Sequence, residues 1–184
     1  KLFENPSQIE AIEYSKTHPQ IATDILPKAN LEYQGWTLTK VPKNDLLNLT
    51  MGDTTSCCQK LGGFGESVCT EGWNDTHSVN YVFTSPSGKV AAHFWAWLDA
   101  NGGLVIDSVE GLSSTSADVI AELLIDFIDA NPEISMYISK TSYGLTKDVV
   151  ARLKEEFILK EMDEPTHVTE YSYTDSSNGV YHIL

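Results

Sequence analysis

The sequence predicts an α/β protein built on a mixed, mostly antiparallel sheet of about six or seven strands, with helices packed on the sheet. Three strand-like segments joined by short turns fill the middle of the chain, between residues 78 and 110. Segments with apolar residues at helical spacing lie before and after them. The 184 residues, of which 41% are hydrophobic, are enough for one domain with a core of its own.

A helical extension is predicted at the N-terminus, over residues 1–35. Its first helix begins near Ser7 and ends before Pro19, because the residue preceding a proline disfavours helical backbone. A shorter helix is expected over 20–26. The domain proper then covers residues 36–184.

The domain opens with a half-buried strand, since WTLTKV (36–41) alternates apolar and polar residues. The following KNDLLNLTMG has helical spacing and ends at Gly52. The middle of the chain is an antiparallel meander, with strands at 78–86, 89–100 and 104–110 and turns rich in Pro, Gly, Asn and Ser between them.

The last third alternates helices with strands. Hydroxyl side chains stand where two helices begin: Thr115 forms a capping box with Asp118, and Thr146 caps the second helix. The predicted elements, in order, are a helix over 117–130, a strand over 133–139, a helix from Thr146 to about Phe157, and strands near 168–174 and 180–184.

The strand at 104–110 is predicted to lie beside the strand at 134–139, with the helix over 117–130 packed on the sheet. The residues expected in the core are Val82, Phe94, Val105, Ile106, Leu123, Leu124, Phe127, Met136, Ile138, Leu153 and Phe157.

Charge narrows the choice of partners. The net charge is −14, with 12 basic residues against 26 acidic ones. Such a chain cannot neutralise a phosphate backbone, so we expect no nucleic acid and no membrane surface as partner. A basic protein or peptide is a better partner for this negative electrostatic field. The odd count of 3 cysteines favours a reducing compartment, the cytoplasm, over a disulfide framework.

The order of strand, helical region, meander, helix, strand, helix and terminal hairpin resembles the fold of the GCN5-related N-acetyltransferases over residues 36–184. LVIDSVEGLSSTSADVIAELL occupies the place where that family holds the pyrophosphate of acetyl-CoA on a loop and helix N-terminus. VVARLKEEF, before the terminal hairpin, is similar to the C-terminal half of the family. The loop itself is degenerate, with one glycine and no arginine.

The resemblance implies one domain of this type, an acyl-CoA-dependent N-acyltransferase or a catalytically degenerate relative, acting on a protein or a small amine. Acetyl-CoA or another acyl-CoA is the implied cofactor, and no metal is expected. The implied cofactor-binding residues are Val109, Gly111, Leu112, Ser113, Ser114, Thr115 and Ser116. Glu110 and Asp107, at the end of the preceding strand, are candidates for the general base; each is alternatively a carboxylate that caps a helix or a sheet edge.

A cysteine enzyme is the second hypothesis. Cys58, His93 and Asp107 follow the chain order of papain- and transglutaminase-like enzymes, and HFWAWLDANGGLVID resembles the transglutaminase His-x-Trp…Asp segment. Such an enzyme needs a thiolate with a lowered pKa next to an imidazole. We prefer Cys58 to Cys57 as the nucleophile because it is closer to the glycine-rich turn that follows.

Two other interpretations of the cysteines are open. Cys57, Cys58, Cys69 and His77 offer zinc-type ligands, although without the Cys-x-x-Cys spacing of a structural site. Alternatively the thiols are buried in a turn-rich connection, where glycines permit positive φ, and label slowly.

A protein-binding module is the third hypothesis. Strand alternation places His93, Trp95 and Trp97 on one face, so the two indoles could form an aromatic wall over a groove. With the acidic surface, this wall would hold a protein partner. Alternatively, helices cover both faces of the strand and the indoles only fill the core.

Overall fold

The computed structural model describes residues 6–19, 25–168 and 174–184. Within them, strands form one sheet in the order β1-β2-β3-β4-β5-β6-β8-β7. Its strands are β1 (Asn30–Tyr33), β2 (Trp36–Lys40), β3 (Ser78–Thr84), β4 (Val90–Leu98), β5 (Leu104–Gly111), β6 (Met136–Ser139), β7 (Leu159–Met162) and β8 (Val180–Ile183). Only β5 and β6 pair in parallel, so the predicted class, mixed and mostly antiparallel, is confirmed.

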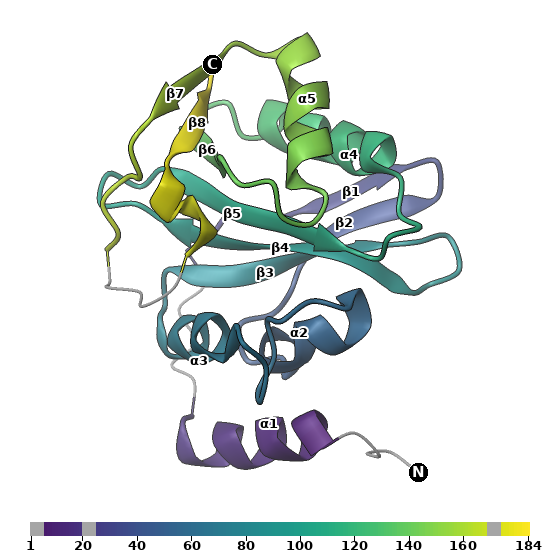
Figure 1. Cartoon of the computed structure of the whole chain (residues 1–184), viewed down its shortest axis with the longest axis vertical. Helices are drawn as coiled ribbons and strands as arrows, with labels where there is room; N and C mark the ends of the chain where they lie inside the picture. The colour runs from purple at the N-terminus through teal and green to yellow at the C-terminus, as the bar shows by residue number, and fades with distance from the viewer. Residues whose placement is uncertain (1–5, 20–24, 169–173) are drawn as a thin grey trace.

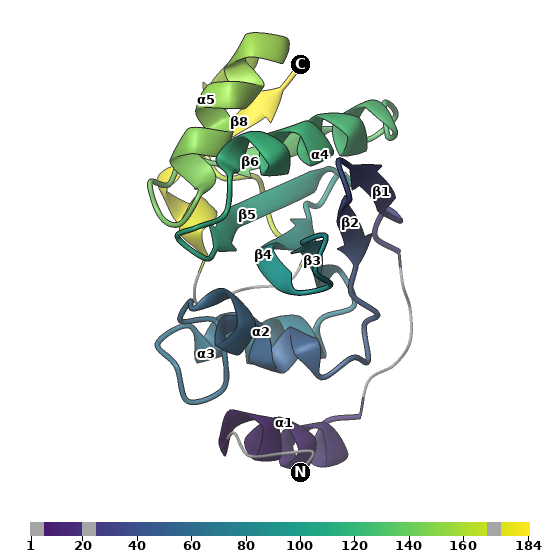
Figure 2. The ribbon, with the colours of Figure 1, turned by 90° about the vertical axis from the view of Figure 1, so that its right-hand side faces the viewer.

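Helices cover both faces of this sheet. They are α1 (Pro6–Thr17), α2 (Leu47–Thr55), α3 (Glu66–Asn74), α4 (Ala117–Asp129) and α5 (Thr146–Glu156), with the short 3₁₀ helix η1 (Asp175–Asn178) before β8. Figure 1 shows α4 and α5 on one face and α2 and α3 on the other, with α1 beyond them. Figure 2 shows the same three layers from the side.

The central strand β4 is buried on both faces. Phe94 stacks on Tyr81 and packs against Phe127 of α4. On the opposite face, Trp95 and Trp97 are 1% and 0% exposed and pack with Val68 of α3. The predicted alternation of β4 is therefore confirmed, whereas the open aromatic wall is wrong, because α3 packs on Trp95 and the His167 ring stacks on Trp97.

The predicted neighbours 104–110 and 134–139 do lie side by side, as β5 and β6. Every residue expected in the core is buried except Phe157, which is half-buried at the end of α5. The predicted helix over 20–26 and strand near 168–174 fall largely on residues outside the described ranges.

The sheet begins earlier than expected. The hairpin of β1 and β2 crosses the boundary predicted at residue 36, so part of the predicted helical extension belongs to the sheet. Its turn, Gln34-Gly35, has φ of 51° and 80°, the positive values of a tight two-residue hairpin. Gln at the first position hid this turn, since Asn or Asp is the usual sequence mark there.

Neither of the two threonines predicted as helix caps is an N-cap residue. The N-cap residues of α4 and α5 are Ser116 and Leu145, and neither makes a side-chain capping bond. Thr115 Oγ1 instead donates to the carbonyl of Ala91 at 3.3 Å, and Thr146 Oγ1 accepts from the N–H of Val109 at 2.8 Å. The hydroxyls tie the helices to the sheet, where burial makes an unsatisfied backbone group costly.

The segment expected as a turn-rich connection contains α3, which the sequence concealed because Gly65 and Gly72 flank and interrupt it. Gly72 is needed there for packing. A Cβ at this position would overlap the ring of Trp95. The absence of a side chain lets the helix lie directly on the indole.

We predict that Gly72→Ala destabilises the protein. In a helix, Ala is favoured over Gly by about 0.5–1 kcal/mol, but overpacking against Trp95 costs about 1–3 kcal/mol. The net change in the free energy of unfolding, measured by urea denaturation, should be a loss. Ser67→Ala, in the same helix but only half-buried, should change it by less than about 0.5 kcal/mol. A Gly72→Ala protein more stable than the parent would contradict the packing.

Candidate functional site

The sheet opens at the end of β5, where β5 and β6 part. Their parallel pairing runs only from Leu104 to Ile106 on β5. Just beyond, Phe94 pairs with Val109 and Ala96 pairs with Ile106. One residue of β4 therefore lies between these pairs, against two residues of β5. The extra residue forms a β-bulge, which re-aims the side chains that follow.

The bulge brings two carboxylates to one face. Residues three apart on a regular strand point to opposite faces. Here Glu110 lies opposite His93 in the register. Asp107 comes two residues after Val105, which lies opposite Trp97. Since these two partners share a face of β4, both acids lie on the face covered by α2 and α3.

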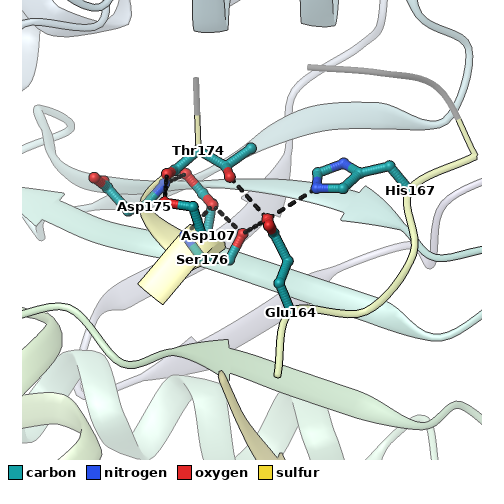
Figure 3. Close-up of polar contacts among 7 residues, drawn as sticks. Asp107, Glu164, His167, Thr174, Asp175 and Ser176 are labelled. Carbon is teal, nitrogen blue, oxygen red and sulfur yellow. Dashed lines mark hydrogen bonds and ion pairs between the residues drawn. The ribbon is translucent and has the colours of Figure 1, made fainter. Parts of the chain in front are cut away.

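Asp107 is fully buried and is held by η1 from the other end of the chain. Its two carboxylate oxygens accept hydrogen bonds from the backbone N–H groups of Asp175 and Ser176, both at 3.0 Å. The Ser176 hydroxyl oxygen lies 2.8 Å from Asp107 Oδ1 and also 2.8 Å from Glu164 Oε1. Figure 3 shows this network, whose members the sequence could not connect because up to 69 positions separate them.

One proton must be shared in this network. The Ser176 hydroxyl can donate to only one of its two carboxylates. Glu164 also bonds His167 Nε2 at 2.9 Å and Thr174 Oγ1 at 2.8 Å; burial raises its pKa, but these hydrogen bonds lower it overall. Burial raises the pKa of Asp107 to about 7, against its hydrogen bonds. Below pH 7, Asp107 is therefore the carboxyl that takes up a proton; it then donates to Ser176 while Ser176 donates to Glu164.

Glu110 has fewer partners. Ser108 Oγ donates to Glu110 Oε1 at 3.3 Å, and no lysine or arginine of the described ranges pairs with this carboxylate. Burial, and then the nearby Asp175 carboxylate, raise the pKa of Glu110. The β6–α5 loop closes on it, since a Cβ at Gly144 would lie 2.6 Å from Glu110 Oε2. Glu110 is thus a half-buried acid that no cation of the described ranges compensates.

His93 is a core residue in contact with Cys57, not Cys58. Its Nε2 lies 3.0 Å from Gln59 Oε1 and 4.0 Å from Cys57 Sγ. Complete burial lowers the pKa of His93 to about 3, so the ring is neutral at ordinary pH. Burial also raises the pKa of Cys57 to about 11. This pair holds a thiol and a neutral imidazole, and not the thiolate–imidazolium pair of a cysteine nucleophile.

The predicted set of Cys58, His93 and Asp107 does not come together. His93 Nδ1, which an orienting carboxylate would contact, has no hydrogen-bond partner. All the hydrogen bonds of Asp107 go to Asp175 and Ser176. Cys58 is exposed, so the expectation that it is buried is wrong as well. Its pKa is raised, by partial burial and then by Glu110.

The cysteines lie in different environments. Cys69 is buried in α3 among Leu49, Leu61 and Trp73, while His77 bonds to Asp75. Within the described ranges, no three or more His, Cys, Asp or Glu side chains gather as a metal site would require.

The glycines between the cysteines shape the α2–α3 loop. The N–H groups of Lys60 and Gly65 both donate to the carbonyl of Cys58, at 2.9 and 3.0 Å. A Cβ at Gly63 would overlap that carbonyl, and one at Gly52 would overlap the carbonyl of Cys57. The loop therefore wraps closely around its own backbone, which places Cys57 against His93.

The predicted cofactor loop divides into two parts. Ser113, Ser114 and Ser116 are exposed, and their N–H groups have no hydrogen-bond partner within the described ranges. The N–H groups of Leu112 and Thr115 are already bonded, to the carbonyls of Ala91 and Leu112. Asp118 adds a negative charge in the first turn of α4, which opposes an anion there.

The part nearer Glu110 is filled by protein. The backbone N–H of Val109 donates to Thr146 Oγ1, and its carbonyl accepts from the N–H of Leu145, both at 2.8 Å. Gly111 is covered, because a Cβ on it would lie 2.8 Å from Leu145 Cδ1. An acyl arm running from the loop to Glu110 would have to cross this stretch. The residues present therefore do not fit a bound acyl-CoA.

Comparisons with protein-family models, with curated proteins and with solved structures found no match to this chain. Within the described ranges, no helix combines the length and hydropathy needed to cross a bilayer.

The raised pKa of Asp107 predicts a pH-dependent stability. The unfolded carboxyl has a pKa of 3.8 and the folded one about 7. The folded state therefore binds the extra proton between these values, and stability falls as pH rises through this window. We expect a loss on the order of 2 kcal/mol between pH 5 and pH 8.

Asp107→Asn should lose much less stability over the same pH range, because the titrating group is gone. Urea midpoints of both proteins at several pH values measure the difference. Parallel pH profiles for the two proteins would show that Asp107 is already ionised at pH 5.

Cys58 should react slowly with iodoacetamide although it is exposed, because its raised pKa keeps it a thiol at neutral pH. Glu110→Gln should speed the reaction by removing a negative charge, and His93→Ala should leave it unchanged. Peptide mass spectrometry after timed labelling gives both rates. Fast labelling of the native protein that His93→Ala abolishes would instead make the cysteine enzyme the leading hypothesis.

Proposed function

We propose that this protein is a catalytically degenerate relative of the GCN5-related N-acetyltransferases, which binds an amine-bearing partner at Glu110 without transferring an acyl group. The partner is a lysine side chain of a basic protein or peptide, or a small amine. The observation that carries the proposal is the half-buried Glu110 carboxylate, which has no lysine or arginine partner within the described ranges.

The architecture supports the relationship. One parallel strand pair, β5 and β6, lies in an otherwise antiparallel sheet, and α4 connects these two strands. The strands part after Ile106, and α5 begins at the opening. A similar topology supports a common ancestor, whereas the chemistry depends on the residues of the site.

The closed opening supports loss of acyl transfer. Leu145 and Thr146 occupy the backbone groups of Val109, and Leu145 covers Gly111. Displacing them would leave buried backbone groups unpaired, at a cost of about 1–3 kcal/mol for each group.

Electrostatics support an amine as the ligand. A cation beside Glu110 would lower the free energy of its ionised form, which burial and Asp175 disfavour. The net charge of −14 would also steer a basic partner toward the protein. Tyr143, which is exposed and precedes the Gly144 that lies against Glu110, offers an apolar contact for such a partner. Because all three cysteines are free thiols, we place the protein in a reducing compartment, the cytoplasm.

Calorimetry tests the proposal with a tetralysine peptide and with acetyl-CoA. The peptide should bind, and Glu110→Gln should weaken it about tenfold, the effect expected of one charge-assisted hydrogen bond. Millimolar acetyl-CoA should give no heat, and no acetylated peptide should form.

Two controls isolate Glu110 from the general negative field. Glu133→Gln removes the same charge at an exposed position and should leave the affinity nearly unchanged. The same peptide with acetylated lysines should bind weakly to the parent protein. Equal losses in the two variants, or acetyl-CoA binding with peptide acetylation, would reject the proposal.

A further inference from the structure

A polar cavity lies beside α5, between this helix, the segment that follows β6, and β8. Its volume is about 370 Å³, within the range of small-ligand pockets. The described lining includes Lys140, Lys147 and Lys154, the hydroxyls of Thr141 and Ser142, and Tyr181. No acidic residue is among the described lining residues.

This concentration of amines is unusual for the chain. There are only 12 basic residues in a protein of net charge −14, yet three of them line one cavity. Lys147 and Lys154 lie seven positions apart on α5, so they share a face of the helix. Neither makes an ion pair with an acid within the described ranges.

The third amine is partly compensated. Lys140 Nζ bonds Glu161 Oε2 of β7 at 2.6 Å. Lys140, with Lys154 more weakly, holds the pKa of Glu161 below its usual range. Asp163 also raises the pKa of Lys140, so two carboxylates outside the cavity face its three amines, which leaves an excess of positive charge.

Tyr181 gives the cavity an aromatic wall. The Lys154 ammonium lies 4.6 Å from the centre of this ring and that of Lys140 lies 5.8 Å from it. Such cation–π contacts orient the amines while leaving their N–H donors available. Val150 and Ala151 add apolar surface beside them.

We propose that this cavity binds a small organic phosphate. Lysine ammonium groups bind phosphate as point charges, and the threonine and serine hydroxyls supply further donors. The aromatic and aliphatic walls suit the organic part of such a ligand. The site uses different residues from Glu110, so it stands or falls independently of the proposed amine site.

Titration with adenosine 5′-monophosphate, followed by calorimetry, tests the site. Binding should saturate, and adenosine should bind at least tenfold more weakly because it lacks the phosphate. The double variant Lys147→Gln with Lys154→Gln should lose at least tenfold in affinity for the nucleotide. Both lysines are exposed, so the variant should fold, and its thermal denaturation checks this.

The matched control removes the same charge elsewhere. Lys28→Gln with Lys89→Gln changes two exposed lysines outside the cavity and should leave nucleotide affinity within about twofold. No saturation at millimolar nucleotide would overturn the proposal. So would equal losses in the two double variants, or equal affinities for adenosine and its monophosphate.

Discussion

The backbone of β5 beyond its parallel pairing is the constraint on which the site depends. After Ile106 this strand has β4 on one side and no strand of the described ranges on the other, because its pairing with the short β6 ends there. Its buried N–H and C=O groups need partners there. The start of α5 supplies them through Thr146 and Leu145. This one arrangement fixes α5 against the sheet, covers Gly111 and brings the preceding loop against Glu110.

Two carboxylates of β5 are buried or half-buried without a neighbouring cation of the described ranges, and this determines their protonation. Asp107 and Glu110 both have raised pKa values, and in each case burial is the largest cause. The two carboxylates differ in their hydrogen-bond partners. Asp107 lies within a complete hydrogen-bond network and shares a proton with Ser176 and Glu164. Glu110 has one hydroxyl donor and is only half-buried. The buried acid therefore holds the C-terminal segment to the sheet, and the half-buried one is the acid that we propose as a ligand site.

The helix α5 lies between Glu110 and the cavity lined by lysines. Its beginning touches the surroundings of Glu110, through Gly144 and Leu145, while Lys147 and Lys154 line the cavity on its outer side. The two proposed sites, for an amine and for a phosphate, would therefore lie on different sides of one helix. Ligand binding on one side of α5 would affect the site on the other side only by moving this helix. The start of the helix is hydrogen-bonded to β5.

The sequence by itself determined the class of fold, the meander, and the core faces of β4 and α4, because these follow from periodicity and turn residues that act over a few positions. It also marked Glu110 and Asp107 as acids at the end of a strand. Only the tertiary structure decided which groups meet. A single bulged residue turned both acids to one face, and Ser176, far along the chain, came to Asp107. Thr115 and Thr146 had the local pattern of helix caps, yet they bond the sheet, because the energetic demand of buried strand backbone exceeds that of an exposed helix end.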